Sequence, residues 1–186
     1  VETKANVVQL TQTTDYPWDG NIKISVAPEH EQRFAILLRI PGWAQNQPVP
    51  SDLYRFTDEQ PLAATVKVNG EAMPMTISKG YVRVERVWKK ADTIEVLLPM
   101  PVRRVISNEK LETNRDKVAL QRGPLVYCLE GVDNEGAVLD LYIPESAQLT
   151  TRQEPDLLGG IVTISGTAGT SQRTSDGRVV ANQERE

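Results

Sequence analysis

The 186-residue sequence contains a single cysteine, Cys128, and a single histidine, His30. One cysteine cannot form an internal disulfide, and a structural zinc site takes three or four Cys or His ligands. No apolar run approaches the ~20 residues of a membrane helix, and the basic residues do not gather into the stripe that nucleic acids require. We therefore expect no metal centre in this chain, no membrane span and no nucleic-acid partner.

Nucleotide binding and targeting signals are also missing from the sequence. Gly159 and Gly160 are followed neither by the Gly-Lys-Ser/Thr of a phosphate loop nor by a helix, so we expect no nucleotide cofactor. The first residues, 1–4, include no initiator Met and do not resemble a signal peptide. We therefore expect an excised or processed piece of a protein.

The residues that are present predict an all-β protein. Hydrophobic residues make up 39% and charged residues 25%, which is a globular composition. Apolar and polar residues alternate in segments spaced roughly ten residues apart, and no segment has a helical period. Together with short apolar segments, they predict strands at 8–13, 22–26, 65–68, 81–86, 93–98, 102–106, 117–120, 125–129, 138–143 and 161–164. This pattern predicts an antiparallel β-sandwich or jelly roll.

The segments divide into two sets. Residues 1–101 have enough strands for one β-sandwich, whereas residues 102–165 have too few to bury two sheets comfortably. We expect the second set either to join the first sandwich or to form a smaller or incomplete β-sandwich. Residues 166–186 are polar and nearly free of large apolar side chains, which predicts a loop or tail.

One further strand, residues 34–40, is apolar on both faces. Phe34, Ile36 and Leu38 share one face, and Ala35 and Leu37 make the other apolar too. A strand of this kind is central in its sheet or covered by a neighbouring domain. We expect this strand and the turn 41–43 to form a docking face, and the isolated chain to self-associate through it. The polar, Pro-rich residues 45–63 predict a long loop.

Three tryptophans, Trp18, Trp43 and Trp88, stand in or beside predicted turns. An indole face can stack on the C–H face of a sugar ring, so these residues are candidate carbohydrate contacts. They can equally fill the end of the sandwich or an interdomain seam, since Trp is well buried on average. The sequence leaves both interpretations open.

The sequence gives little support for any catalytic residue. Glu85 and Glu95 lie on consecutive predicted strands, and a pair of carboxylates ~5–9.5 Å apart can hydrolyse glycosides. With 25 acidic residues, however, nearby pairs arise by chance. Cys128 lies in an apolar strand and is expected to be a buried structural thiol, while His30 is expected in a solvated turn. We assign no catalytic residue and no metal ligand in this chain.

Several strings, taken together and in order, resemble glycoside hydrolase family 127, typified by bacterial β-L-arabinofuranosidases. The resemblance runs from about residue 7 to about residue 165. The strings are Tyr-Pro-Trp-Asp-Gly at 16–20, Leu-Arg-Ile-Pro-Gly-Trp at 38–43, Val-Asn-Gly at 68–70, Gly-Tyr-Val at 80–82, Arg-Val-Trp at 86–88, Leu-Pro-Met-Pro at 98–101 and Val-Ala-Leu-Gln-Arg-Gly-Pro-Leu-Val-Tyr-Cys-Leu-Glu at 118–130.

The resemblance implies a larger parent enzyme. Members of that family carry an N-terminal (α/α)₆ barrel, with a zinc-bound cysteine nucleophile and a catalytic glutamate, followed by two β-sandwiches. None of the barrel motifs occurs here, so Cys128 is not given the role of the nucleophile, and zinc is expected in the barrel alone. The resemblance also implies further strands after the tail, so we expect the second sandwich to be incomplete.

Three functions follow from these observations. The first is a non-catalytic accessory β-sandwich portion of a glycosidase, with the barrel as its partner. The second is a carbohydrate-binding module that uses Trp18, Trp43 or Trp88. The third is a small hydrolase built on carboxylates of this chain. We rank them in that order.

Overall fold

The computed structural model describes residues 2–3, 6–58, 63–134, 138–173 and 179–185. It is built almost entirely of antiparallel β-strands, as predicted, and the short helices in the described residues are 3₁₀ turns. Two compact units are present, unit 1 (Val1–Leu125) and unit 2 (Val126–Glu186). No helix among the described residues is long and apolar enough to cross a membrane.

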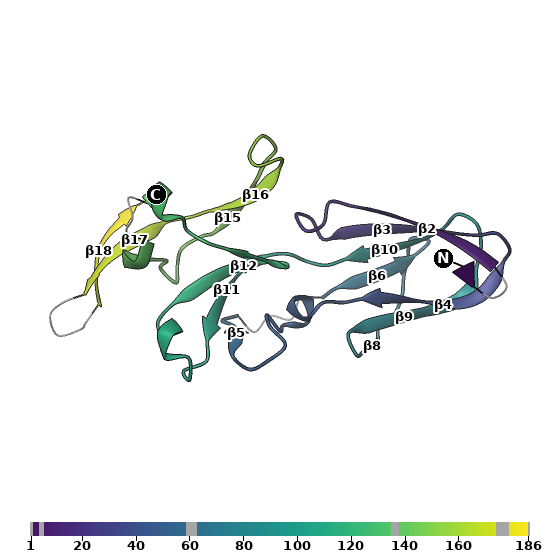
Figure 1. The fold of residues 1–186 in the computed structure, drawn as a ribbon, viewed down its shortest axis with the longest axis horizontal. Coiled ribbons are helices and arrows are strands. Elements are labelled where there is room, and N and C mark those ends of the chain that lie inside the picture. The colour runs from purple at the N-terminus through teal and green to yellow at the C-terminus, as the bar shows by residue number, and fades with distance from the viewer. Residues whose placement is uncertain (1, 4–5, 59–62, 135–137, 174–178, 186) are drawn as a thin grey trace. The chain divides into compact units, whose positions relative to one another are not determined.

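Unit 1 contains a six-stranded and a three-stranded sheet. The first has the order β1-β2-β3-β10-β6-β7 and the second the order β4-β9-β8. Their strands are β1 (Glu2–Thr3), β2 (Asn6–Thr14), β3 (Asn21–Pro28), β10 (Asp92–Leu97), β6 (Thr65–Val68), β7 (Glu71–Ala72), β4 (Gln32–Arg39), β9 (Tyr81–Trp88) and β8 (Ile77–Ser78). Figure 1 shows β3, β10 and β6 side by side.

Period-two alternation places the core between these two sheets. Val26, Val66 and Ile94 point inward from the six-stranded sheet, while Val82 and Val84 point inward from the three-stranded sheet, and all are buried in one cluster. Successive side chains of a strand point to opposite faces, so the intervening residues face outward. The predicted β-sandwich is therefore present, with its core between these two sheets.

Tight turns fix the register at the strand ends. Asn69 and Gly70 both have positive φ, 53° and 82°, and they join β6 to β7 with Val68 opposite Glu71. Positive φ at both central positions is what an Asn-Gly hairpin turn requires. Gly20 allows a close approach, because a Cβ there would lie 1.9 Å from the carbonyl oxygen of Leu98.

A third sheet continues unit 1 beyond residue 101. It contains β11 (Val102–Ser107), β12 (Val118–Arg122) and β5 (Tyr54–Phe56), with η1 (Gly42–Gln45) before β5 and η2 (Glu112–Asn114) between β11 and β12. Phe56 and Val105 join the core cluster of the sandwich. The predicted loop 45–63 thus includes a strand, because pairing with β11, rather than local sequence, makes residues 54–56 extended.

Arg103 anchors this loop to β11. Its guanidinium is 3% exposed, donates a hydrogen bond of 2.7 Å from Nε to Oδ1 of Asp58 and lies over the ring of Phe56 at 3.5 Å. Its Nη2 also donates to Oδ1 of Asn46, at 2.6 Å. A buried charge is tolerated when it is paired and hydrogen-bonded in this way.

Unit 2 is built of short strands. β14 (Leu141–Tyr142), β17 (Ala168–Arg173) and β18 (Val179–Arg185) form one sheet, and β15 (Thr150–Glu154) pairs with β16 (Ile161–Ser165). β13 (Leu125–Tyr127) begins at the end of unit 1, and η3 (Gly131–Asn134) and η4 (Val138–Asp140) precede β14. The segment 138–143, predicted as a strand, is thus half 3₁₀ turn.

The stretch 166–186, predicted as a polar loop or tail, contains β17 and β18 instead. These strands pair over residues 168–173 and 179–185, with a bulge between Thr170 and Ser171. A polar segment can form a strand when hydrogen bonds between its backbone and a partner strand stabilise the extended conformation without an apolar face. Residues 174–178 and 186 of that stretch lie outside the described residues.

The predicted docking strand β4 is an edge strand of its sheet, not a central one. Leu37 is 59% exposed on the outer face, whereas Leu38 and Ile40 are buried in the core. Trp43, in the adjoining turn, is also buried. The outer face of β4 is therefore a surface of the unit, and Trp43 of the adjoining turn belongs to the core.

Candidate functional site

The outer face of the six-stranded sheet carries a hollow of about 460 Å³ that four strands line. Residues 22, 24 and 26 of β3 face the core, so Asn21 and Lys23 face outward, and the same alternation turns Glu95 and Leu97 of β10 outward. We call this hollow the outer groove. It is lined by Thr13, Thr14, Asp15, Asp19, Asn21, Ile22, Lys23, Thr65, Lys67, Glu95, Val96 and Leu97.

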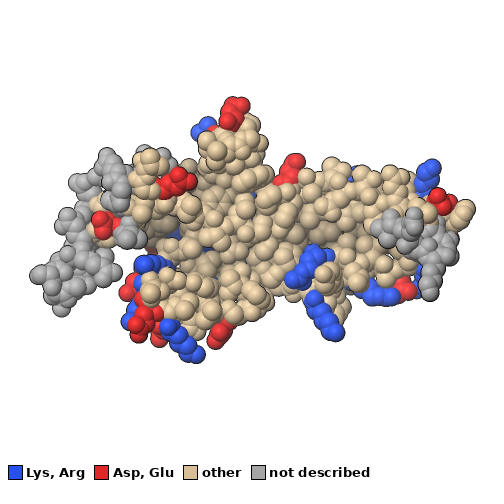
Figure 2. All heavy atoms as spheres, viewed as in Figure 1, with Lys and Arg blue, Asp and Glu red and all other residues tan. Residues whose placement is uncertain are grey.

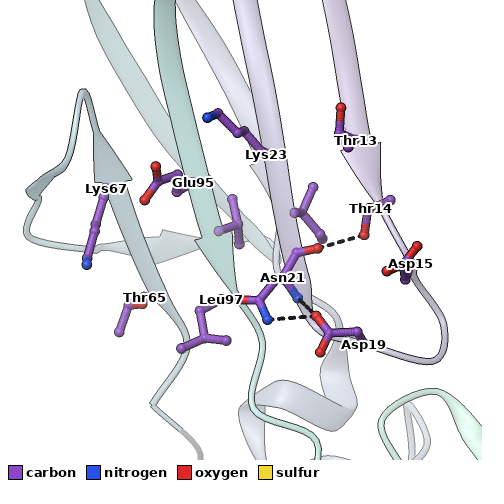
Figure 3. A pocket seen from close by; sticks show the side chains of 12 residues that line it. Thr13, Thr14, Asp15, Asp19, Asn21, Lys23, Thr65, Lys67, Glu95 and Leu97 are labelled. Carbon is purple, nitrogen blue, oxygen red and sulfur yellow. Dashed lines mark hydrogen bonds between the residues drawn. The ribbon is translucent and has the colours of Figure 1, made fainter. Parts of the chain in front are cut away.

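Strand register brings a row of charged side chains across the outer groove. Glu95 of β10 lies directly opposite Lys23 of β3 and Lys67 of β6. Figure 3 shows the carboxylate of Glu95 between the two lysines. None of the three forms an ion pair within 4.0 Å with any described residue. Two donors and one acceptor therefore remain available at the surface.

One end of the outer groove is held by hydrogen bonds. Asn21 donates from its backbone N–H and from Nδ2 to Oδ1 of Asp19, at 2.6 and 2.7 Å. Thr14 donates from Oγ1 to the carbonyl of Asn21 at 2.8 Å. These bonds, drawn in Figure 3, fix the β2–β3 connection against the strand ends. The wall of the groove is thus preorganised.

The three tryptophans do not form an exposed platform. Trp88 is fully buried and donates from Nε1 to the carbonyl of Phe34 at 3.0 Å, and Trp43 is 7% exposed. Trp18 is half-buried, and its carbonyl accepts a hydrogen bond of 2.8 Å from Nη1 of Arg122. Burial within unit 1 removes Trp43 and Trp88 as stacking surfaces for a sugar.

The carboxylates that the sequence suggested as a pair are separated by the sandwich. Glu85 lies on β9 and Glu95 on β10, and these strands belong to opposite sheets with both side chains facing outward. A hydrogen bond and the positive charge of Arg83, with a smaller effect of Arg33, lower the pKa of Glu85. Glu85 and Glu95 cannot act on one glycosidic bond.

The thiol and the imidazole belong to different units. Cys128 is exposed, contrary to the expected burial, because β13 ends at Tyr127 and leaves the next residue outside the strand. His30 lies in an exposed bend of unit 1, as expected, and Cys128 belongs to unit 2. Within the described residues, no group of three His, Cys, Asp or Glu side chains is placed to hold a metal ion.

Sequence reasoning missed the outer groove. Lys23, Lys67 and Glu95 come from three distant segments, and their adjacency depends on register rather than on a local motif. The alternation of apolar and polar residues does indicate that Lys23, Lys67 and Glu95 each lie on the polar face of their own predicted strand. On the face drawn in Figure 2, the Lys and Arg side chains of described residues are dispersed, with no stripe of one charge.

Comparison with known families matches both sets of strands. Residues 1–100 match the family model described as the middle domain of glycoside hydrolase family 127, β-L-arabinofuranosidase. Residues 102–167 match the C-terminal domain of the same family. These models meet where the sequence predicted a boundary, whereas compact packing divides the chain after Leu125. The boundary at residues 101 and 102 therefore stays a prediction.

Individual relatives agree with the family models. A non-reducing end β-L-arabinofuranosidase of Bifidobacterium longum is 31% identical over 170 residues, which are 86% of this chain and 23% of that protein. A solved family 127 β-arabinofuranosidase is 35% identical with a TM-score of 0.88, covering 99% of this chain and 29% of that one. A family 127 β-L-arabinofuranosidase from Geobacillus stearothermophilus is 37% identical with a TM-score of 0.79, covering 100% and 27%.

The chain thus spans between a fifth and a third of the length of these relatives. The matches cover most of the chain, and the structural agreement extends over both units. The chain belongs to glycoside hydrolase family 127, of which it contains the middle and C-terminal domains.

Proposed function

We propose that this chain is the non-catalytic β-sandwich portion of a larger β-L-arabinofuranosidase-like enzyme. The observation that carries the proposal is the match of residues 1–100 and 102–167 to the middle and C-terminal domains of the family. The arrangement of side chains supports it, since Glu85 and Glu95 face outward from opposite sheets, and Cys128 and His30 belong to different units. The parent enzyme acts on arabinose-containing glycans in this proposal.

The partner of unit 1 in this proposal is the catalytic barrel, and the docking face is the outer side of β4 and β9. Leu37, Tyr81 and Val87 are 59%, 41% and 43% exposed on that side. Leu37 lies opposite Arg83 and Val87 lies opposite Arg33, so apolar and charged side chains are mixed on this face and a partner would contact both. Covering this face would remove their apolar area from water, which stabilises an assembly. Zinc, where present in the parent enzyme, belongs to the barrel and not to this chain.

Turnover by the isolated chain tests the accessory role. The chain is incubated with p-nitrophenyl β-L-arabinofuranoside beside a full-length family 127 enzyme, and cooperative unfolding shows that the chain is folded. We expect p-nitrophenol release equal to that in buffer. Release that disappears in Glu95→Gln or Glu85→Gln would contradict the proposal and favour a hydrolase built on this chain.

Light scattering at high protein concentration tests the docking face. We expect the isolated chain to associate, and Leu37→Lys to reduce the association because the charge must be desolvated in the contact. Leu53→Lys is the matched control, since Leu53 is 41% exposed in a loop of the same unit. A monodisperse wild-type monomer, or equal effects of the two variants, would count against the docking face.

A further inference from the structure

We propose that the outer groove is a binding site for a short neutral oligosaccharide. The proposal moves carbohydrate recognition from the tryptophans, of which Trp43 and Trp88 are buried, to the sheet surface formed by β2, β3, β10 and β6. The volume of about 460 Å³ lies within the ~300–1,000 Å³ typical of small-molecule sites. The proposal of a binding site does not require that the chain be a non-catalytic accessory portion. The choice of an arabinose disaccharide as a probe rests on the proposed function.

The charged row of the outer groove is not used in holding the fold together. Lys23, Glu95 and Lys67 are neighbours across three strands, yet none is engaged in an ion pair with another described residue. Ammonium groups only donate hydrogen bonds, and an ionised carboxylate only accepts them. A ligand that both donates and accepts can therefore engage the whole row.

The mixed charge of the row selects the class of ligand. Two lysines and three carboxylates, of Glu95, Asp15 and Asp19, line the groove, so their charges nearly cancel and a ligand gains little from a net charge of either sign. A sugar hydroxyl can donate to Glu95 and accept from Lys23 or Lys67 without bringing a net charge. Hydrogen bonds to charged groups are the stronger ones, so three such contacts orient a neutral polyol.

The outer groove also offers an apolar contact. Leu97 is 41% exposed on the same outward face as Glu95, and it lies opposite Thr65 of β6 and Asn21 of β3. Its methyl groups can cover the C–H side of a sugar ring while the charged row binds the hydroxyls. The contact lacks an aromatic face, so we expect weak binding that needs a titration at high ligand concentration.

Hydrogen bonds and the underlying strands hold the wall and the floor of the outer groove in place. The hydrogen bonds from Asn21 to Asp19 and from Thr14 to Asn21 fix one wall. The strands beneath carry Val66, Ile94 and Val96, which are buried in the core. A rigid floor reduces the entropy that is lost on binding.

Titration of the ¹⁵N-labelled chain, followed by NMR, tests the site. The probes are arabinobiose, maltose, glucuronate and glucosamine, which compare two neutral sugars with an anionic and a cationic one. We expect saturable shifts at the backbone amides of Lys23, Lys67 and Glu95 with at least one neutral disaccharide, and weaker binding of both charged sugars.

The matched variants are Glu95→Gln in the outer groove and Glu85→Gln on the opposite sheet. We expect Glu95→Gln to weaken binding about tenfold, which is about 1.4 kcal/mol, and Glu85→Gln to leave it unchanged. The unfolding transition of each variant shows that the fold is retained. The binding measurement does not involve turnover of a substrate. The binding site can therefore be confirmed or refuted independently of the non-catalytic role proposed for the chain.

Four results would overturn the proposal. They are the absence of saturable shifts with both neutral sugars, preferred binding of glucuronate or glucosamine, equal effects of Glu95→Gln and Glu85→Gln, and shifts centred on the indole of Trp18 instead of the groove. The last result would return carbohydrate recognition to the half-buried tryptophan of the β2–β3 connection.

Discussion

Unit 1 and unit 2 differ most in how much apolar surface they bury. The core cluster of unit 1 contains 17 buried hydrophobic residues drawn from its three sheets. Among the unit 2 residues whose side chains the structure describes, Val162 is the one hydrophobic side chain in the buried class, and Val132 and Leu158 are each 85% exposed. Because apolar burial is the dominant favourable term in folding, we expect unit 1 to be much the more stable of the two.

Strand length and alternation account for the difference. β3, β4 and β9 each have eight residues, and every second side chain enters the shared core. β15 has five residues, four of them exposed, and its partner β16 contributes Val162 to the interior. A small sheet of this kind obtains little stability from its own packing. We expect unit 2 to rely on neighbouring surfaces in a larger protein.

The largest expected effect is in the core of unit 1. Trp88→Ala removes a fully buried indole and its hydrogen bond to Phe34. We expect the free energy of unfolding to fall by about 3–5 kcal/mol. The measurement is urea unfolding followed by circular dichroism. A loss below 1 kcal/mol would contradict the central place of Trp88 in the core.

A matched pair of smaller substitutions compares the units directly. Val66→Ala in unit 1 should cost about 2 kcal/mol, because two methyl groups leave a packed core. Val162→Ala in unit 2 should cost less than about 1.6 kcal/mol, since its surroundings can collapse around the change.

Two probes separate the responses of the units. All three tryptophans lie in unit 1, and Cys128, the sole cysteine, is exposed in unit 2 and can carry a fluorophore. We expect Val66→Ala to shift the tryptophan transition and Val162→Ala to shift the label transition alone. Coincident shifts of both signals in both variants would show that the units unfold together.

The smallest expected effect concerns a buried turn of unit 1. Asp92 is 7% exposed; burial raises its pKa, but hydrogen bonds from the Lys89 backbone N–H and from Asn69 outweigh this and lower it overall. A lowered folded pKa gives stability that is present above the unfolded pKa of ~3.9 and is lost as the pH falls through the folded pKa.

Asp92→Asn should therefore lower the free energy of unfolding at pH 7 by about 1 kcal/mol, the value of one hydrogen bond. The difference from the wild type should shrink as the pH falls below ~4. Tryptophan-monitored urea unfolding at pH 7 and pH 3 measures it, and a difference that grows toward pH 3 would refute the assignment. The label on Cys128 should report no change.

The sequence predicted unit 1 better than unit 2 for a physical reason. Alternation located β6 at residues 65–68 and β10 within one residue, because their inward side chains make the core. β5, β15, β17 and β18 were missed, since backbone pairing with a partner strand, not an apolar face, makes them extended. Local pattern carries little information about such strands.

The candidate site was predictable only in part. Alternation indicates that Lys23, Glu95 and Lys67 face away from the core, but their sequence separations of tens of residues conceal that they are neighbours. The burial of Trp43 and Trp88 likewise depends on tertiary packing. Local sequence placed them beside turns, where exposed and buried tryptophans have the same pattern.

Amide hydrogen exchange tests the contrast between the two units most directly. Amides open with free energies that range from near zero to the global value, according to the local packing. The account predicts that Ile24, Val84 and Ile94 exchange orders of magnitude more slowly than the paired amides of β15 and β16. Comparable protection in both regions of the isolated chain would contradict it.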